Sequence, residues 1–327
     1  MKKKYIFLLL MLGILIFGGC RLFPADTIPL EIKEKYTNDD GLIHAYPSQQ
    51  DTEYLSESIG LYMQYLVLVK DEKRFQEQYE LLQSNYQIQK GDFYFIQWVL
   101  AENTTVNALI DDVRIITALN DASAQFNEPK YAESANQLTL AISDIEQSNG
   151  YTVDFYDWSL NLPADRITLS YLTNDFFRTI SDRDNMESLL KNVDEKAIFF
   201  PEYFDVTKNV YSKSDEVHMI DQLLIAINRE SIGHSSELFK TWCINEWKDH
   251  GKLYGRYDRQ TQNASVTYES LAVYYYLSTY FQKIKEPGLA KEVQQHAELL
   301  ASESMLKDAH FFDYIHYRLM TNKNNTE

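Results

Sequence analysis

The chain has 327 residues, and lysine plus arginine number 31 against 48 aspartates and glutamates, a formal net charge of −17. Nucleic acid and anionic lipid headgroups need a basic surface, so both are excluded as main partners, and a neutral or cationic ligand fits better. With only two cysteines, no disulfide framework can hold the fold, and its stability has to come from a large apolar core.

The first twenty residues have the pattern of a secretory signal. Three lysines open an apolar run that ends at Phe17, before Gly18, Gly19 and Cys20. An uncleaved membrane anchor is the alternative, but the run is shorter than the roughly 20 residues that span a bilayer. The end of the segment resembles the lipobox of bacterial lipoproteins, with Phe17 where leucine is usual. We therefore expect a signal peptide at 1–19, lipid on Cys20, and a mature chain at the extracellular face of the cell membrane.

The rest of the chain is predicted to form a tether, one domain and a short tail. Residues 20–50 are polar and interrupted by prolines, which is typical of a tether and surface approach, and 321–327 form a polar tail. Between them, in the predicted domain 51–320, apolar residues recur at helical spacing, with short breaks. These stretches lie at 53–69, 72–84, 105–123, 129–148, 170–182, 184–197, 214–230, 236–248, 266–283, 287–300 and 303–318.

Two kinds of helix are expected. Stretches 53–69 and 266–283 are apolar on nearly every side, as in helices enclosed by protein, whereas 72–84 and 287–300 keep one polar face. Their alternation predicts an all-α (α/α)6 barrel, with an outer ring of helices around an inner one. A peptide-binding solenoid of helical repeats is the competing fold, and it would leave the first and last helices far apart.

Two carboxylates stand inside apolar helical stretches. They are Glu57 and Asp112, and the face of Asp112 is shared by Ile115, Ile116 and Leu119. An ionised carboxylate that faces an apolar interior is costly unless it is paired, hydrogen-bonded or used in chemistry. The pattern predicts an acidic cleft at the mouth of a helical bundle.

Several other chemistries lack their motifs. The sequence has no Gly-x-Ser-x-Gly, no His-Glu-x-x-His, no glycine-rich phosphate loop and no Cys-x-x-Cys. His310 and His316 stand on different sides of a helix, which argues against a shared metal. Cys243 is interpreted as a buried small hydrophobe. We expect no metal and no cofactor.

Two motifs resemble those of glycoside hydrolase family 8. The family's general-acid motif resembles residues 56–63 and is matched at Ser56, Glu57, Gly60 and Met63. The family's aspartate-rich signature resembles residues 108–119.

In this second motif Asp112 keeps its place, but Ile110 stands where the first aspartate belongs, and Asp111 follows one position later.

Further segments follow in the family's order. Asp92 to Trp98 resembles a sugar-stacking tryptophan segment, and Leu169 to Tyr171 resembles the start of a later inner helix. Ile220 to Leu223 resembles the stretch that carries the general base, without its arginine. Tyr268 to Ser270 resembles the start of the last inner helix. Together the similar segments extend over about 50–320. The resemblance implies a barrel fold and a polysaccharide hydrolase of the kind that accompanies exopolysaccharide synthesis.

The resemblance also implies roles for the carboxylates. Glu57 would be the general acid, Asp221 the general base and Asp112 a ligand of the distorted sugar, with Asp165 and Asp157 as alternative bases. An inverting mechanism would place acid and base about 6.5–9.5 Å apart.

Each role has a structural alternative. Glu57 could simply cap its helix, Asp221 could be a solvated or capping residue, and Asp112 could be a buried, paired carboxylate. Arg114 shares a face more closely with Asp111, so we expect the structural ion pair to be Asp111–Arg114.

Three aromatic residues are candidate platforms for sugar rings: Trp98, Tyr171 and Trp158. Core packing is the alternative for each. The leading hypothesis is a monomeric, lipid-anchored hydrolase of a polysaccharide, the cell's own exopolysaccharide, with this substrate and the membrane as its partners. A catalytically inactive relative that binds glycan or scaffolds a synthase complex is the second hypothesis.

Overall fold

A computed structural model describes residues 27–47, 52–180 and 183–323. The predicted signal peptide, Cys20 and the last four residues of the tail lie outside the described residues. None of the helices in these ranges is long and apolar enough to cross a membrane.

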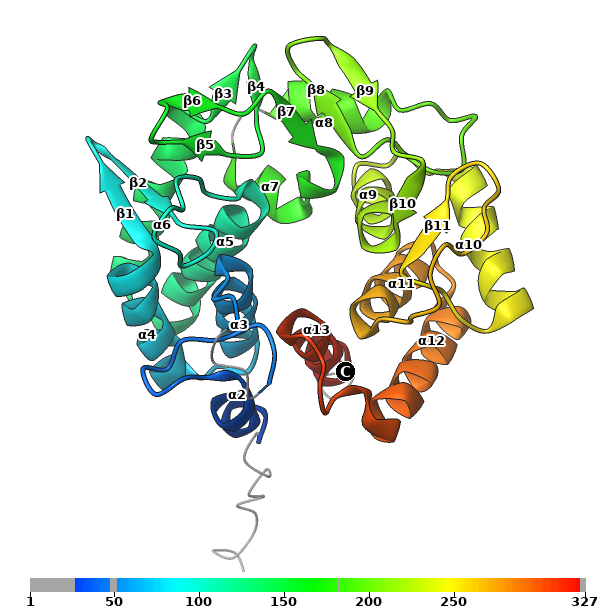
Figure 1. Ribbon diagram of the computed structural model, residues 1–327, viewed down its shortest axis with the longest axis horizontal. Helices are drawn as coiled ribbons and strands as arrows, with labels where there is room; N and C mark the ends of the chain where they lie inside the picture. Colours follow the sequence, from blue (N-terminus) through cyan, green and yellow to red (C-terminus); the bar gives the residue numbers. More distant parts are fainter. Residues whose placement is uncertain (1–26, 48–51, 181–182, 324–327) are drawn as a thin grey trace, which may run out of the picture.

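Helices form two concentric rings (Figure 1). The inner helices are α3 (Ser56–Leu68), α5 (Leu109–Phe126), α7 (Asn174–Thr179), α9 (Met219–Ser231), α11 (Leu271–Lys283) and α13 (Phe311–Lys323). The outer helices are α2 (Ile28–Tyr36), α4 (Glu72–Leu81), α6 (Pro129–Asp144), α8 (Arg183–Lys191), α10 (Glu237–His250) and α12 (Pro287–Leu300). This is the predicted (α/α)6 barrel.

The inner ring closes on itself, because α13 packs against both α11 and α3. Hydrogen bonds join the ends of the described chain: Tyr36 donates to the carbonyl of Ala309 at 2.9 Å, and Tyr314 donates to Glu31 at 2.7 Å. An open solenoid is therefore excluded.

The N-terminal segment corrects one prediction. Residues 20–50 were expected to be a tether, but in the described part of this segment α2 buries Ile28, Ile32 and Tyr36 against the barrel. These apolar residues recur every fourth position, so they form one stripe on the helix. The folded domain therefore includes α2.

A close helix contact fixes the start of the barrel. Gly60 of α3 lies against α5, where a Cβ atom would stand 2.9 Å from Cγ1 of Ile115 and 3.4 Å from Cδ of Arg114. Since only glycine leaves this space, α3 and α5 approach closely and bring their first turns together.

Short antiparallel hairpins, which the sequence analysis did not predict, fill the connections between helices. They are β1 (Gln87–Lys90) with β2 (Phe93–Ile96), β3 (Gln147–Ser148) with β4 (Tyr151–Thr152), β5 (Tyr156–Asp157) with β6 (Leu162–Pro163), β7 (Arg166–Thr168) with β8 (Tyr203–Asp205) and β9 (Val210–Ser212), and β10 (Glu216–His218) with β11 (Arg256–Asp258).

Some expected helices are shorter than predicted. The stretch 170–182 overlaps the 3-10 turn η2 (Leu169–Tyr171) and contains the six-residue α7. The stretch 214–230 includes strand β10 near its start. Two π-helical turns, η1 (Leu82–Tyr86) and η3 (Ala301–Met305), extend α4 and α12.

Candidate active site

A cavity of about 480 Å³ opens at the start of the inner helices. Its carboxylates are Glu57, Asp221, Glu269 and Asp313, which come from α3, α9, the segment before α11, and α13. A hollow of about 530 Å³ between α2 and α4 is slightly larger, but none of the residues predicted for the site lines it. The predicted acidic cleft corresponds to the first cavity.

Glu57 lies in the first turn of α3 with its carboxyl at the cavity. Burial raises the pKa of Glu57 to about 8, the negative charge of Asp111 adds to this increase, and the Arg114 cation opposes it. The positive end of the helix favours the ionised form, so here burial prevails. Glu57 therefore holds its proton at neutral pH, as a general acid must.

Behind Glu57, a buried ion pair within α5 is joined to α3 by a hydrogen bond. Arg114 donates to one oxygen of Asp111 at 2.6 Å, and the Ser56 hydroxyl donates to the other at 3.0 Å. The prediction of an Asp111–Arg114 pair is thus confirmed. Arg114 also lines the cavity, although its charge is already matched by Asp111.

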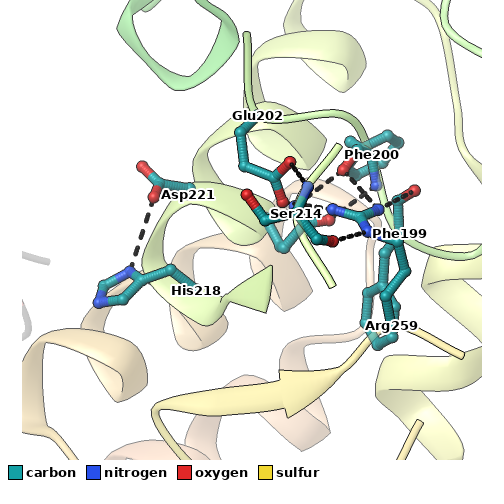
Figure 2. Close-up of polar contacts among 8 residues, drawn as sticks. Phe199, Phe200, Glu202, Ser214, His218, Asp221 and Arg259 are labelled. Atoms are coloured by element: carbon teal, nitrogen blue, oxygen red, sulfur yellow. Dashed lines mark hydrogen bonds and ion pairs between the residues drawn. The ribbon is translucent and has the colours of Figure 1, made fainter. Parts of the chain in front are cut away.

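Asp221 stands in the first turn of α9 and lines the same cavity as Glu57. Its Oδ1 atom accepts a hydrogen bond from the Ser170 hydroxyl at 2.7 Å, and its Oδ2 atom lies 3.7 Å from Nδ1 of His218 (Figure 2). Within the described part of the chain Oδ2 accepts no hydrogen bond, so it is able to accept a proton from water.

The other two carboxylates of the cavity are more fully engaged. Glu269 accepts hydrogen bonds from Tyr274 and His296, the latter at 2.8 Å, both on Oε2. Asp313 accepts from the Ser270 hydroxyl at 2.6 Å and from the backbone N–H of Ala272 at 2.8 Å, so it caps α11. Asp221 is the better candidate base.

Asp112 is not at the cavity, contrary to the prediction. Its side chain is buried on the other side of α5, where the Asn107 amide donates to Asp112 at 2.6 Å and to Glu146 at 2.5 Å. The apolar face that drew attention to Asp112 packs into the core, so the carboxylate is directed there too. Its buried, hydrogen-bonded environment matches the structural alternative.

The alternative bases also lie elsewhere. Asp157, the last residue of β5, accepts hydrogen bonds from the backbone N–H and hydroxyl of Ser159, at 2.8 and 2.7 Å, in the turn that follows the strand. Asp165 is exposed in the short connection before β7. Neither residue lines the cavity.

Of the three predicted platforms, one reaches the cavity. Tyr171 in η2 lines it, whereas Trp158 is buried with Phe95 in a separate apolar cluster. Trp98 is 40% exposed and supports the site only through its carbonyl, which accepts a hydrogen bond from the backbone N–H of Ser56 at 2.9 Å.

Other rings of the cavity were missed: Tyr268, Tyr276, His218, His310 and Phe312. Tyr276 is fixed by a 2.8 Å hydrogen bond with Nε2 of His316. The helical-face pattern of α11 could have indicated Tyr276, because it follows Val273, another cavity residue, by one turn. Tyr268 precedes the helix and carries no such signal.

Arg259 orders the loops next to Asp221 without contacting it (Figure 2). Its guanidinium donates to the carbonyls of Phe199 at 3.1 Å and Phe200 at 2.9 Å, and it pairs with Glu202. In the general-base stretch that residues 220–224 resemble, an arginine is expected at position 224. Leu224 stands there instead and lines the cavity.

No family model matches the chain. A Bacillus subtilis protein named "Putative lipoprotein YdaJ" is 30% identical over 247 residues, which are 72% of this chain and 67% of the relative. The crystal structure of PssZ from Listeria monocytogenes is 36% identical, with a TM-score of 0.84, and the match covers 90% of this chain and 94% of PssZ.

The chain belongs to the family of YdaJ and PssZ. More distant structures share its fold. An alpha-amylase from Clostridium perfringens is 20% identical with a TM-score of 0.75, covering 88% of this chain and 94% of the other. The family 8 endoglucanase Cel10 from Klebsiella pneumoniae is 16% identical with a TM-score of 0.61, covering 84% and 99%.

Proposed function

We propose that this family 8-like protein hydrolyses a polysaccharide with inversion at the anomeric carbon, Glu57 serving as general acid and Asp221 as general base. The observation that carries the proposal is that a carboxyl group with a pKa of about 8 and a second, accessible carboxylate line one cavity. Glycoside hydrolysis needs such a pair in opposite protonation states.

In the proposed reaction, the Glu57 carboxyl gives its proton to the glycosidic oxygen while the bond between that oxygen and the anomeric carbon breaks. A water molecule attacks the anomeric carbon from the opposite face and loses a proton to Asp221. The leaving sugar departs as an alcohol, Glu57 ends ionised and Asp221 ends protonated. Exchange of protons with solvent restores both groups.

Measurement of reducing ends tests the assignment. We would incubate the protein with β-linked glucans, chitosan and the producing cell's own exopolysaccharide, which is our proposed substrate. Glu57→Gln and Asp221→Asn should each lower the rate about 10²–10⁴-fold, since general acid–base catalysis contributes that much. Glu128→Gln, on the outer surface before α6, is the matched control. Full activity of Glu57→Gln would refute the acid assignment.

The stereochemistry is a separate test. Proton NMR of the first product formed from a β-linked oligosaccharide should show the α anomer before mutarotation. A β product would mean a retaining mechanism, in which the second carboxylate attacks carbon directly.

Two cavity residues favour a second candidate function, a glycan-binding protein without activity. Ile110 lines the cavity at the position of the signature's first aspartate, and Leu224 lines it near Asp221. Apolar side chains there cannot hold sugar hydroxyls. Glycan binding without any product after long incubation would support this function.

We further propose that lipid on Cys20 anchors the protein at the extracellular face of the membrane. The lipobox-like segment and the name of the Bacillus subtilis relative support this proposal. Cys20→Ser should move the protein from the membrane fraction to the medium, while persistence in the membrane fraction would contradict a lipid anchor.

A further inference from the structure

His218 stands beside Asp221 at the junction of a strand and a helix. It ends β10, where it pairs with Arg256 of β11, and it is the N-cap residue of α9. Its side chain lines the cavity and is 41% exposed, with Nδ1 at 3.7 Å from Oδ2 of Asp221. Figure 2 shows the two side chains facing each other.

A carboxylate that activates water has to keep one orientation. Ser170 holds Oδ1 of Asp221, but a single hydrogen bond leaves the carboxylate free to rotate about the axis of its side chain. A second donor on Oδ2 would fix the plane of the group, while the remaining lone pair of Oδ2 still faces the cavity.

Nearby cations have other partners. Arg114 pairs with Asp111 at 2.6 Å, Arg256 pairs with Glu216 at 2.7 Å, and Arg259 bonds the loop carbonyls described above. Among the residues that the structure describes, His218 is the His, Lys or Arg side chain that reaches ion-pair distance of Asp221.

We propose that His218 is a positioning residue for Asp221, and this inference rests on the proposed hydrolase function. In the substrate complex its Nδ1–H group donates to Oδ2, since hydrogen bonds of catalytic groups that are long in the free enzyme tighten when substrate binds. His218 thereby supplies the second donor that an apolar residue at position 224 cannot give.

Three substitutions test the proposal. His218→Leu should lower kcat about 10- to 100-fold with little change in KM, because a misoriented base affects the chemical step. His218→Asn should recover most of kcat, since its amide nitrogen occupies the place of Nδ1. His218→Gln should behave like His218→Leu, since its amide nitrogen occupies the place of Nε2.

The matched control is His250→Leu. The Nε2 atom of His250 also lies 3.7 Å from a carboxylate, that of Glu246, but on α10 and outside the cavity. The His250→Leu variant should leave kcat and KM unchanged.

Two outcomes would overturn the proposal. A rise in KM with unchanged kcat for His218→Leu would make His218 a substrate ligand. Equal kcat values for the His218→Asn and His218→Gln variants would also contradict it. If the Leu variant does not fold, the Asn–Gln comparison decides.

A spectroscopic test separates this inference from the hydrolase function. Long-range ¹H–¹⁵N spectra of protein labelled at histidine should show the Nδ1–H tautomer for His218, and Asp221→Asn should weaken that preference. Wild-type protein inactive on every polysaccharide would refute the proposed function. An Nε2–H tautomer that Asp221→Asn leaves unchanged would refute the contact with His218, whatever the activity.

Discussion

The carboxyl groups that share the cavity differ in charge because their immediate surroundings differ. Burial raises the pKa of Glu57 to about 8. Glu269 is also partly buried, but hydrogen bonds from Tyr274 and His296 outweigh burial and lower its pKa. Donors aimed at a carboxylate stabilise its ionised form, whereas a site without them favours the acid. One cavity thus holds a proton donor, Glu57, together with a carboxylate of lowered pKa, Glu269.

The pKa of Glu57 predicts a pH-dependent cost in stability. In the folded state it lies at about 8, above its ordinary value of 4.5, so the folded protein binds the proton more tightly than the unfolded chain does. The contribution of Glu57 to stability is therefore largest below pH 4.5 and declines as the pH rises toward 8.

Glu57→Gln removes this titration. We expect the melting temperature of the variant, relative to wild type, to rise between pH 5 and pH 8 while polysaccharide cleavage is lost. Calorimetry at several pH values measures the difference. A difference that is constant with pH would show that Glu57 titrates normally in the folded protein.

Asp112 is a buried carboxylate for which we expect no catalytic role, in contrast to Glu57. Burial raises its pKa well above the ordinary range, and the Asn107 hydrogen bond only partly opposes this. Asp112→Asn keeps an acceptor for Asn107 and replaces the titratable carboxyl group with a neutral amide. Cleavage should stay within about threefold of wild type, because the side chain is outside the cavity. A loss of cleavage as large as that of Glu57→Gln, with the fold intact, would return Asp112 to the site.

The sequence predicted the acidic residues of the cavity better than its walls. Glu57 could be located because a carboxylate in an apolar helical stretch is unusual enough to be noticed, and Asp221 because its segment resembles the family's general-base stretch. Asp112 has the same property and is structural, since the pattern does not tell which side of a helix faces a cavity. Trp158 and Trp98 depend on loop paths, which the sequence pattern does not determine.

At the level of elements, the segment before α11 shapes the cavity through a contact with a glycine. Tyr268 is 48% exposed and lines the cavity, and a Cβ atom at Gly255 would stand 2.2 Å from Cε2 of its ring. The ring therefore lies directly on the backbone at Gly255. A flat, exposed ring in this position suits contact with the apolar face of a sugar.

Gly255→Ala should displace this ring and raise KM with little effect on kcat. Tyr268→Ala should do the same, and the double variant should be no worse than either single one, since both remove the same contact. Steady-state kinetics of the three proteins measure the coupling. Additive effects would mean that Gly255 acts independently of Tyr268.

Helix existence was more predictable than helix boundaries. The long stretches 53–69, 72–84 and 129–148 contain α3, α4 and α6, because their apolar spacing persists over several turns. The hairpins were missed, since strands of two to four residues are too short for an alternating pattern. Asn149-Gly150, both with positive φ, is a hairpin signal that the 129–148 helix obscured.

At the scale of the whole molecule, closure of the barrel depends on α2 as well as on the inner ring. Glu31 of α2 accepts hydrogen bonds from Tyr314 at 2.7 Å and Arg318 at 2.6 Å, both on α13. The sequence predicted a closed ring but placed its first helix in a tether, because the charged residues between Ile32 and Tyr36 gave the segment a polar average.

Two truncations test whether α2 belongs to the domain. A chain that begins at Thr27 keeps α2, and a chain that begins at Thr52 removes it and uncovers the helices against which Ile32 and Tyr36 are fully buried. Burial of each such side chain contributes about 1.5–3 kcal/mol, so their joint loss is a large part of the roughly 5–15 kcal/mol that stabilises a typical protein.

Urea unfolding should show wild-type stability for the chain that begins at Thr27. The chain that begins at Thr52 should show a strongly lowered midpoint or be insoluble. Equal midpoints would mean that the barrel closes without α2 and that the segment before residue 51 is a tether after all.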